Sequence, residues 1–238
     1  MKTYLLRLLD LFFPRLCVGC GKSWTYICTT CKKELTPHPD RCPFCYRVMR
    51  HGQTCYDCFT QHRQLAGVMV AFVYTEMIKK LILHLKFFHR YDVVWFFADR
   101  LSLLIQTNPS FTEAKAQWML FVTFVPSHRR RRWVVKWYNQ SELLAKQVAQ
   151  HIEVPLVQWL KKQKHTAWQT TRTRKQRLTN LIGAFSSTTL PSLPSWATLI
   201  IIDDITTTGA TLDQVAKERK KHYPCIQVWW VVVGRHGK

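Results

Sequence analysis

Two adjacent carboxylates, Asp203 and Asp204, follow an apolar run in the stretch TLIIIDDITTTGAT, residues 198–211. At ~5 Å they would repel by about 3 kcal/mol at an effective dielectric constant of 20, which favours a partner such as sugar hydroxyls or Mg²⁺. The loop behind them precedes a predicted helix over 210–223, and backbone N–H groups at a helix N-terminus bind phosphate. A strand end with a threonine-rich turn is the alternative. The predicted phosphate loop consists of Thr207, Thr208, Gly209 and Thr211.

Eight of the nine cysteines form four C-x-x-C pairs within the first 58 residues. Two residues between thiolates allow both sulfurs to lie ~2.3 Å from one zinc ion, and two such pairs complete a tetrahedron. Four pairs therefore predict two structural Zn²⁺ sites. Pairing of consecutive motifs closes the shortest loops, and we favour it over a cross-braced arrangement; disulfides fit poorly, since we see no export signal. The predicted ligands are Cys17, Cys20, Cys28, Cys31, Cys42, Cys45, Cys55 and Cys58.

The chain of 238 residues has 35 basic and 14 acidic residues, a net charge of +21 and ten tryptophans. Clustered basic side chains with aromatic residues between them are typical of proteins that hold single-stranded nucleic acid. The clusters lie in 128–140 and 161–177, and a solvated basic surface is the alternative. We predict a single-stranded DNA track formed by Arg130, Arg131, Arg132, Lys136, Lys161, Lys162, Lys164, Arg172, Arg174, Lys175 and Arg177.

These side chains must be positioned by elements that alternate along the chain. Apolar runs predict strands at 65–74, 119–125, 154–160, 197–203 and 225–233, and helical periodicity appears at 76–91, 140–152 and 210–223. Such alternation indicates an α/β fold with a mainly parallel sheet flanked by helices, whose ligands bind at the carboxyl ends of the strands. The Ser/Pro-rich residues 186–195 read as a surface loop.

The N-terminal residues 1–17 are apolar but interrupted by Arg7 and Asp10, so we expect a short amphipathic helix there. No run reaches the ~20 apolar residues of a membrane span. We therefore expect a cytoplasmic protein without a transmembrane segment. The predicted division is a zinc module at 1–64 and an α/β domain at 65–238.

The acidic stretch resembles the phosphoribosyl pyrophosphate motif of type I phosphoribosyltransferases. The resemblance extends over nearly the whole chain to the ComF family of bacterial competence operons. It rests on the paired cysteines and on LILHLKF at 81–87, VPSHRRRRWVVKWYNQSELLA at 125–145 and HTAWQTTRTRKQRLTNLIGAF at 165–185. It implies a type I phosphoribosyltransferase-like fold preceded by a double zinc ribbon.

The resemblance also implies residue roles. Asp203 and Asp204 would hold the ribose hydroxyls, the threonine-glycine loop the 5′-phosphate, and Mg²⁺ would accompany phosphoribosyl pyrophosphate. The pyrophosphate loop would contain Ser127, His128 and Arg129, and Gln169, Arg177 and Asn180 match polar positions of the hood over the substrate. The chain departs from the family at 136–140, which read KWYNQ where the family has Arg-Gly-Phe-Asn-Gln, and lacks a glycine after LKF.

Two functions remain open. The resemblance implies a competence factor that handles incoming single-stranded DNA with the ATP-driven translocase ComFA and other competence proteins, at the membrane-associated DNA-uptake machinery. The alternative is an active phosphoribosyltransferase, although no residue identifies an acceptor and the catalytic residues are unknown. A third hypothesis is that the zinc ribbons dock a protein partner.

Overall fold

The computed structural model describes residues 15–22, 25–61, 65–87, 91–126, 139–162, 185–187, 193–206, 223 and 225–235. The first part contains the cysteine pairs and little regular structure. Its short elements are α2 (Thr29–Lys33), the 3-10 helix η1 (Arg50–Gly52) and α3 (Tyr56–Thr60). The amphipathic helix predicted near the N-terminus lies outside the described residues.

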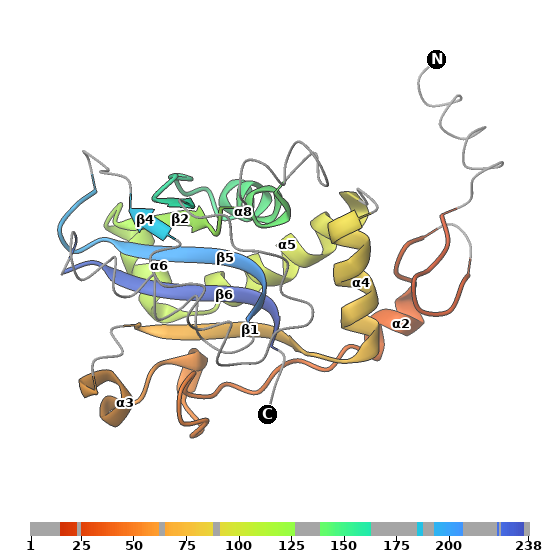
Figure 1. Cartoon of the computed structure of the whole chain (residues 1–238), viewed down its shortest axis with the longest axis horizontal. Coiled ribbons are helices and arrows are strands. Elements are labelled where there is room, and N and C mark those ends of the chain that lie inside the picture. The colour runs from red at the N-terminus through yellow and green to blue at the C-terminus, as the bar shows by residue number, and fades with distance from the viewer. Residues whose placement is uncertain are drawn as a thin grey trace, which may run out of the picture.

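The rest of the described chain is built on a four-stranded parallel sheet in the order β1-β6-β5-β2 (Figure 1). The strands are β1 (Gly67–Val73), β2 (Leu120–Phe124), β5 (Thr198–Thr206) and β6 (Gln227–Arg235). The helices are α4 (Glu76–Phe87), α5 (Tyr91–Gln106), α6 (Pro109–Ala116) and α8 (Gln140–His151). Four of the five predicted strands, the helix at 140–152 and the parallel α/β class are confirmed.

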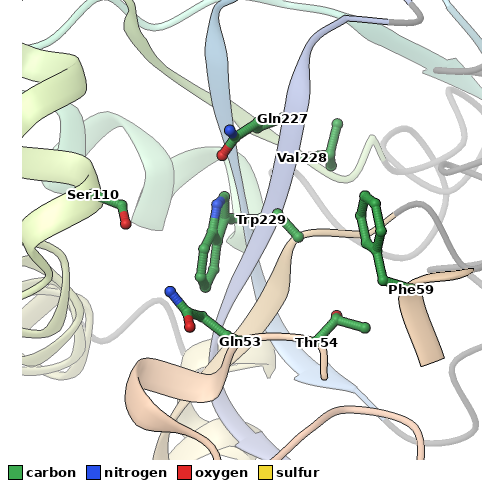
Figure 2. Close-up of a pocket in the computed structure, with 8 residues that line it drawn as sticks. Gln53, Thr54, Phe59, Ser110, Gln227, Val228 and Trp229 are labelled. Carbon is green, nitrogen blue, oxygen red and sulfur yellow. The ribbon is translucent and has the colours of Figure 1, made fainter. Parts of the chain in front are cut away.

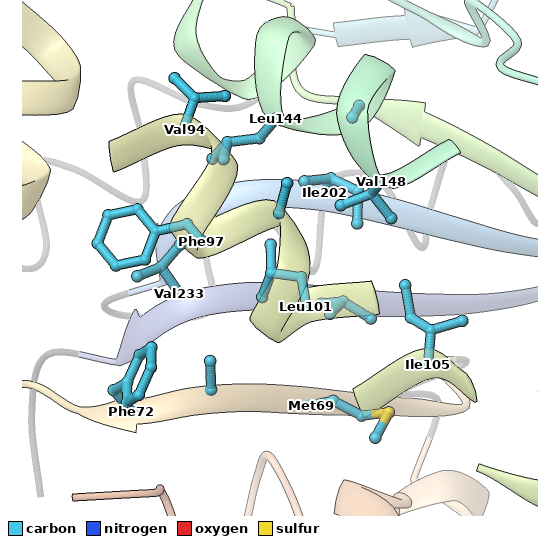
Figure 3. Packing of buried hydrophobic residues seen from close by; sticks show 14 of the residues in the cluster. Met69, Phe72, Val94, Phe97, Leu101, Ile105, Leu144, Val148, Ile202 and Val233 are labelled. Carbon is cyan, nitrogen blue, oxygen red and sulfur yellow. The ribbon is translucent and has the colours of Figure 1, made fainter. Parts of the chain in front are cut away.

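Alternate residues of each strand enter two separate layers of the core. On one face, Met69, Ile202 and Val233 pack against α5 and α8, as Figure 3 shows. On the other face, Val70, Ile201 and Trp230 pack with Trp159 and Leu160. Both faces of the sheet are buried, which explains why the strands read as continuous apolar runs.

Three predicted elements differ from the structure. The helix predicted over 76–91 ends at Phe87, and Tyr91 begins the next helix, α5. The strand predicted at 154–160 joins the sheet only through one parallel bridge between Val122 and Leu156. The loop predicted at 186–195 begins within β4 (Phe185–Ser187), which pairs antiparallel with β3 (Leu160–Lys162). In the segment 154–160, Pro155 lacks the backbone N–H that a regular strand ladder requires, and this limits its pairing with β2.

The zinc module covers the outer edge of β1. Val73 N donates to Thr36 O at 2.9 Å, and Thr54 N donates to Ala66 O at 2.9 Å. A free strand edge presents unpaired N–H and C=O groups, so this contact completes the sheet. The first cysteine cluster also joins the main core, together with α4 and α5. The boundary at residues 64 and 65 stays a prediction.

Among the described residues, no helix is long and apolar enough to cross a membrane.

Candidate functional site

The acidic pair lies near the carboxyl end of β5, although not at its last residue. Asp203 pairs with Val232 of β6, and the strand continues to Thr206, opposite Arg235. Sequence reasoning ended the strand at Asp203, so the strand is longer than predicted. Its extra residues hold the backbone of both acids in a regular ladder.

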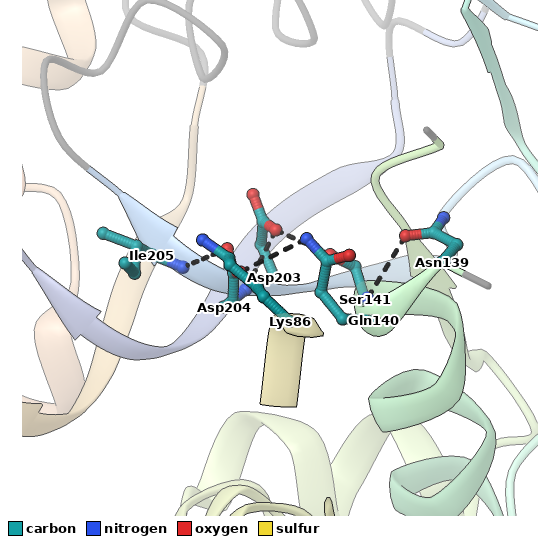
Figure 4. A network of polar contacts seen from close by, with 7 residues as sticks. All are labelled: Lys86, Asn139, Gln140, Ser141, Asp203, Asp204 and Ile205. Atoms are coloured by element: carbon teal, nitrogen blue, oxygen red, sulfur yellow. Dashed lines mark hydrogen bonds and ion pairs between the residues drawn. The ribbon is translucent and has the colours of Figure 1, made fainter. Parts of the chain in front are cut away.

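Three elements converge on these carboxylates: β5, the N-terminus of α8 and the last turn of α4 (Figure 4). Ser141 Oγ donates to Asp203 Oδ1 at 2.8 Å. Gln140 Nε2 donates to Asp204 Oδ2 at 3.3 Å, and Lys86 Nζ lies 2.7 Å from the same oxygen. Asn139 caps α8, since its side chain accepts from Ser141 N at 3.2 Å. The N-terminus of α8 is therefore fixed beside the acidic pair, where its dipole favours negative charge.

The two carboxylates carry different charges at neutral pH. Burial and the neighbouring Asp204 raise the pKa of Asp203 to about 7, despite the hydrogen bond from Ser141. Burial would also raise the pKa of Asp204, but the charge of Lys86 and its hydrogen bond outweigh burial and lower this pKa. Burial would lower the pKa of Lys86, and Asp204 raises it instead. Lys86 and Asp204 thus form a buried ion pair, and Asp203 titrates near neutrality.

Within the described part of the chain, the hydrogen bonds to Asp203 all go to one of its two carboxylate oxygens. Its Oδ1 accepts from Ser141 and from the backbone N–H of Asp204, the latter at 2.9 Å. Figure 4 shows its second oxygen directed away from this network. Asp204 is more fully engaged, because Ile205 N also donates to its Oδ1 at 2.8 Å. Asp203 is therefore the better placed of the two acids to accept a ribose hydroxyl or to contact Mg²⁺.

Sequence reasoning did not identify Lys86, Gln140 or Ser141 as site residues. Lys86 stands in LILHLKF, in the last turn of α4 together with His84, and Gln140 and Ser141 begin the helix after β2. For Gln140 and Ser141, the available signal was a helix that begins with polar residues after a parallel strand. The signal for Lys86 was weaker, because a lysine near a helix C-terminus is ordinary.

Most other predicted ligand contacts lie outside the described residues. These are the phosphate loop Thr207, Thr208, Gly209 and Thr211, the pyrophosphate loop Ser127, His128 and Arg129, and the hood residues Gln169, Arg177 and Asn180. The same holds for Arg130, Arg131, Arg132, Lys136, Lys164, Arg172, Arg174 and Lys175. Lys161 is exposed on β3, and the backbone of Lys162 follows it. The predicted DNA track remains a prediction.

The eight paired cysteines form two separate clusters. The first contains Cys17, Cys20, Cys28 and Cys31, and the second contains Cys42, Cys45, Cys55 and Cys58; within each, the sulfurs lie within 4.8 Å of one another. Four sulfurs at ~2.3 Å from one zinc ion in a tetrahedron are ~3.8 Å apart, so both clusters fit the metal. Consecutive pairing of the motifs is confirmed, and the cross-braced alternative is excluded.

Backbone N–H groups prepare each cluster for zinc in the same way. Cys28 N donates to Cys17 Sγ at 3.4 Å, and Cys55 N donates to Cys42 Sγ at 3.5 Å. Burial opposes ionisation, but N–H groups from both halves of the cluster lower the pKa of Cys17 to about 6 and that of Cys42 to about 7. A thiolate is the form that binds zinc, so each ribbon offers one at neutral pH.

The second ribbon also contacts the carboxyl end of the sheet. Arg235, the last residue of β6, donates from Nη2 to Pro43 O at 2.6 Å and to Tyr46 Oη at 2.8 Å. Its guanidinium lies 4.4 Å from the centre of the Tyr46 ring. Pro43 stands between Cys42 and the next ligand, and Arg235 pairs with Thr206 of β5. One arginine of β6 therefore joins a zinc knuckle to the neighbour of β5, the strand that carries the acidic pair.

Comparisons with known proteins agree with both parts of the chain. Residues 8–59 match the double zinc ribbon domain, and residues 138–238 match the phosphoribosyl transferase domain. Competence protein F of Haemophilus influenzae is 28% identical over 225 residues, which cover 92% of this chain and 96% of the relative. DNA utilization protein YhgH of Escherichia coli K12 is 27% identical over 221 residues, 85% of this chain and 88% of the relative. The protein of that name from Salmonella typhimurium is 27% identical over 217 residues, with the same coverages.

Proposed function

We propose that this chain, with its double zinc ribbon and phosphoribosyl transferase domain, is a ComF-type competence factor that handles incoming single-stranded DNA during natural transformation. We further propose that Asp203 and Asp204 hold a phosphoribosyl pyrophosphate-type ligand with Mg²⁺. The names of the relatives support a competence role. The single observation that carries the ligand proposal is the second oxygen of Asp203, directed away from an otherwise closed network.

The described site residues have distinct proposed tasks. Asp203 accepts a hydroxyl of the ribose, and Ser141 keeps its carboxylate oriented. Lys86 and Gln140 hold Asp204 in one position, so that the two acids do not separate under their mutual repulsion. Bound Mg²⁺ would supply positive charge for the diphosphate. Carboxylates that are fixed in position before the ligand arrives favour the binding of a flexible sugar diphosphate.

The threonine-glycine loop that follows β5 would receive the 5′-phosphate, and Ser127, His128 and Arg129 would receive the pyrophosphate. Both segments follow strands of the sheet at its carboxyl edge, β5 and β2 respectively. Ligands of open α/β sheets bind at this edge. The position of the acidic network near the end of β5 supports the same assignment.

The DNA proposal rests on the distribution of charge. Of 35 basic residues, 19 lie outside the described residues, together with only three of the 14 acidic residues. Most of the excess positive charge therefore belongs to segments such as 127–138 and 163–184. A polyanion that contacts them would release counterions, and this release drives binding whatever the base sequence. ComFA and other competence proteins are the proposed partners, in the cytoplasm at the DNA-uptake machinery.

An active phosphoribosyltransferase is the second candidate, favoured by the match over 138–238 and by the ordered Asp203–Ser141 contact. Catalysis would require positioning of the sugar and stabilisation of its leaving pyrophosphate. Both candidates require the same ligand at the acidic pair. They differ in whether the ligand is consumed.

The double variant Asp203→Asn, Asp204→Asn tests the proposal. Calorimetry should show loss of binding of phosphoribosyl pyrophosphate with Mg²⁺, while affinity for a single-stranded oligonucleotide persists. Lys79→Met, on the exposed face of α4, serves as the control for folding. Transformation assays then show whether the acidic pair is needed: collapse of transformation with intact DNA binding shows that the site is functional in either candidate. Unchanged ligand binding in the double variant would refute the site assignment.

A further inference from the structure

A cavity lies at the amino ends of the strands, at the opposite end of the sheet from the acidic pair. Its volume is about 360 Å³, and its walls come from both parts of the protein. Gln53 and Phe59 belong to the second zinc ribbon, Gln227 and Trp229 to the start of β6, and Ser110 to the first turn of α6 (Figure 2). The cavity therefore forms only where the ribbon meets the amino ends of the strands.

The described lining is neutral and offers hydrogen bonds as well as rings. Two carboxamides and a hydroxyl come from Gln53, Gln227 and Ser110. A carboxamide carries one acceptor and two donors, so it can pair with an edge that presents both. No lining residue within the described part of the chain is charged. The amide and hydroxyl groups of the described lining suit a neutral polar group, because they can replace the hydrogen bonds that such a group loses with water.

Trp229 forms the inner wall of the cavity. Its side chain is buried, at 2% exposure, and its Nε1 has no partner among the described residues. The six-membered ring lies against Gly67, where an added Cβ would come within 2.3 Å of Trp229 Cζ3. In Figure 2 the indole nitrogen lies at the opposite end, toward Gln227. Because this nitrogen is almost completely covered by protein, Trp229 contributes the surface of its ring to the cavity rather than a hydrogen-bond donor.

Phe59 supplies an aromatic surface on the ribbon side. It is 46% exposed although it lines the cavity. It follows Cys58, a ligand of the second cluster, directly in the chain, so bound zinc would fix its backbone. A large exposed aromatic residue that is held in place is a surface on which a planar ring can stack.

We propose that this cavity takes one unstacked nucleobase. A base is a planar heteroaromatic ring with donors and acceptors on its edge, which the carboxamides of Gln53 and Gln227 match. Its size fits a cavity of about 360 Å³, and its neutral ring suits the described lining, while the phosphates stay outside. The inference rests on the proposed handling of single-stranded DNA. It gives the second ribbon a direct contact with a base, at the opposite end of the sheet from Asp203.

The proposal is tested by measuring how two variants bind an oligonucleotide with bases and an oligonucleotide without bases. Phe59→Ala should weaken binding of an oligothymidylate about fivefold or more, because one stacked base contributes at least about that factor. Gln227→Ala should also weaken it, because the hydrogen bonds of its carboxamide to the base are lost. Binding of an abasic oligonucleotide of equal length and charge should stay unchanged. The matched controls are Tyr56→Ala, an exposed aromatic residue on α3, and Gln117→Ala, an exposed glutamine after α6; neither lines the cavity. Equal losses for both strands would overturn the proposal.

Free deoxynucleosides distinguish the two sources of the base. Saturable binding of thymidine that is lost in Gln227→Ala, with strand binding unaffected, would identify a free nucleoside as the occupant. If the unaltered chain binds neither oligonucleotide, the proposed DNA function itself fails. If it binds both and all four variants behave alike, only the cavity assignment is wrong.

Photocrosslinking avoids the question of altered folding, because it uses the unaltered protein. An oligonucleotide with 4-thiothymidine should crosslink to the peptides that contain Phe59 or Trp229. Crosslinks confined to residues 127–138 and 163–184 would contradict the assignment. Zinc content and melting temperature of each variant should match those of the unaltered chain.

Discussion

At the scale of single residues, the acidic pair works as two different groups. Lys86 neutralises Asp204, at 2.7 Å in a largely buried position, and leaves Asp203 with a raised pKa. The lysine side chain is 22% exposed and that of Asp204 is 8% exposed, so solvent screens the pair weakly. One acid is thus committed to the fold, and the other is available to a ligand.

Replacing Lys86 should expose this division of roles. Lys86→Met leaves Asp204 buried without its cation, and breaking a buried pair costs about 3–5 kcal/mol. The double variant Lys86→Met, Asp204→Asn should recover most of the lost free energy of unfolding. Lys79→Met, which breaks the exposed pair with Glu76, should cost at most about 1 kcal/mol. Chemical denaturation measures all four proteins, and equal losses for both lysines would refute the buried pair.

The pKa of Asp203 predicts a pH-dependent difference in stability. Its folded pKa of about 7 lies above the unfolded value of 3.8, so the folded chain holds the proton more tightly. This contribution is complete below about pH 4 and is lost as the pH rises through 7. Asp203→Asn removes the loss, and the variant should gain on the order of 2 kcal/mol relative to the unaltered chain between pH 5 and pH 8. A pH-independent difference in the free energy of unfolding would contradict the raised pKa.

At the scale of elements, the zinc ribbons are part of the architecture that supports the sheet. The first ribbon joins the main core, and the second contacts the edge of β1 and the end of β6. Zinc binding supplies much of the folding free energy of modules this small. Loss of zinc should therefore disturb the sheet as well as the ribbons.

Serine replacements should show that the ribbons bind zinc separately. We expect two zinc ions per chain in the unaltered protein and one in Cys45→Ser, because each cluster contains all four of its own ligands. Cys20→Ser is the matched variant in the other ribbon and should also retain one ion. Mass spectrometry of the intact native protein gives the count. Loss of both ions in either variant would mean that the ribbons do not fold independently of each other.

Arg235 should couple the second ribbon to the sheet. Arg235→Met removes two hydrogen bonds from a residue that is 9% exposed, and we expect a loss of about 2–3 kcal/mol in the free energy of unfolding. Zinc transfer to a chelator from the second cluster should also become faster. Arg47→Met breaks an exposed pair with Asp57 on the same ribbon and should change stability by less than about 1 kcal/mol. Similar effects of both substitutions would argue against the coupling.

At the scale of the whole molecule, positive charge is unevenly distributed along the chain. The described residues hold most of the acids, and the excess of basic residues lies elsewhere in the sequence. Strand binding should therefore depend strongly on salt, with log affinity falling by roughly 0.7 per phosphate contacted for each unit of log salt. Titration of one oligonucleotide at several salt concentrations measures this slope.

Charge reversal locates the charges responsible. Arg130→Glu with Arg131→Glu should weaken binding of all single strands alike and reduce the salt slope. Lys79→Glu with Lys80→Glu changes the net charge by the same amount on exposed positions of α4 and serves as the control. Equal losses in both double variants would show that net charge, rather than a local track, determines binding.

The sequence alone was enough to predict those features that depend on residues close to one another in the chain. The C-x-x-C spacing set the zinc ligands, because two intervening residues suffice to bring two sulfurs to one metal. Continuous apolar runs identified β1, β2, β5 and β6, because both faces of these strands are buried. Apolar residues at helical spacing identified α8. The adjacent acids, which resemble part of a phosphoribosyl pyrophosphate motif, were visible because they are neighbours in the sequence.

Tertiary structure alone decided which distant residues surround those acids. Ser141 lies 62 positions from Asp203, and Arg235 lies 192 positions from Pro43. They meet because the strand order β1-β6-β5-β2 brings the ends of α4, α8 and β6 to one edge of the sheet. The burial that raises the pKa of Asp203, and the ion pair through which Lys86 lowers the pKa of Asp204, both depend on that convergence. Neither has a periodic signature in the chain, since both arise from contacts between segments far apart in sequence.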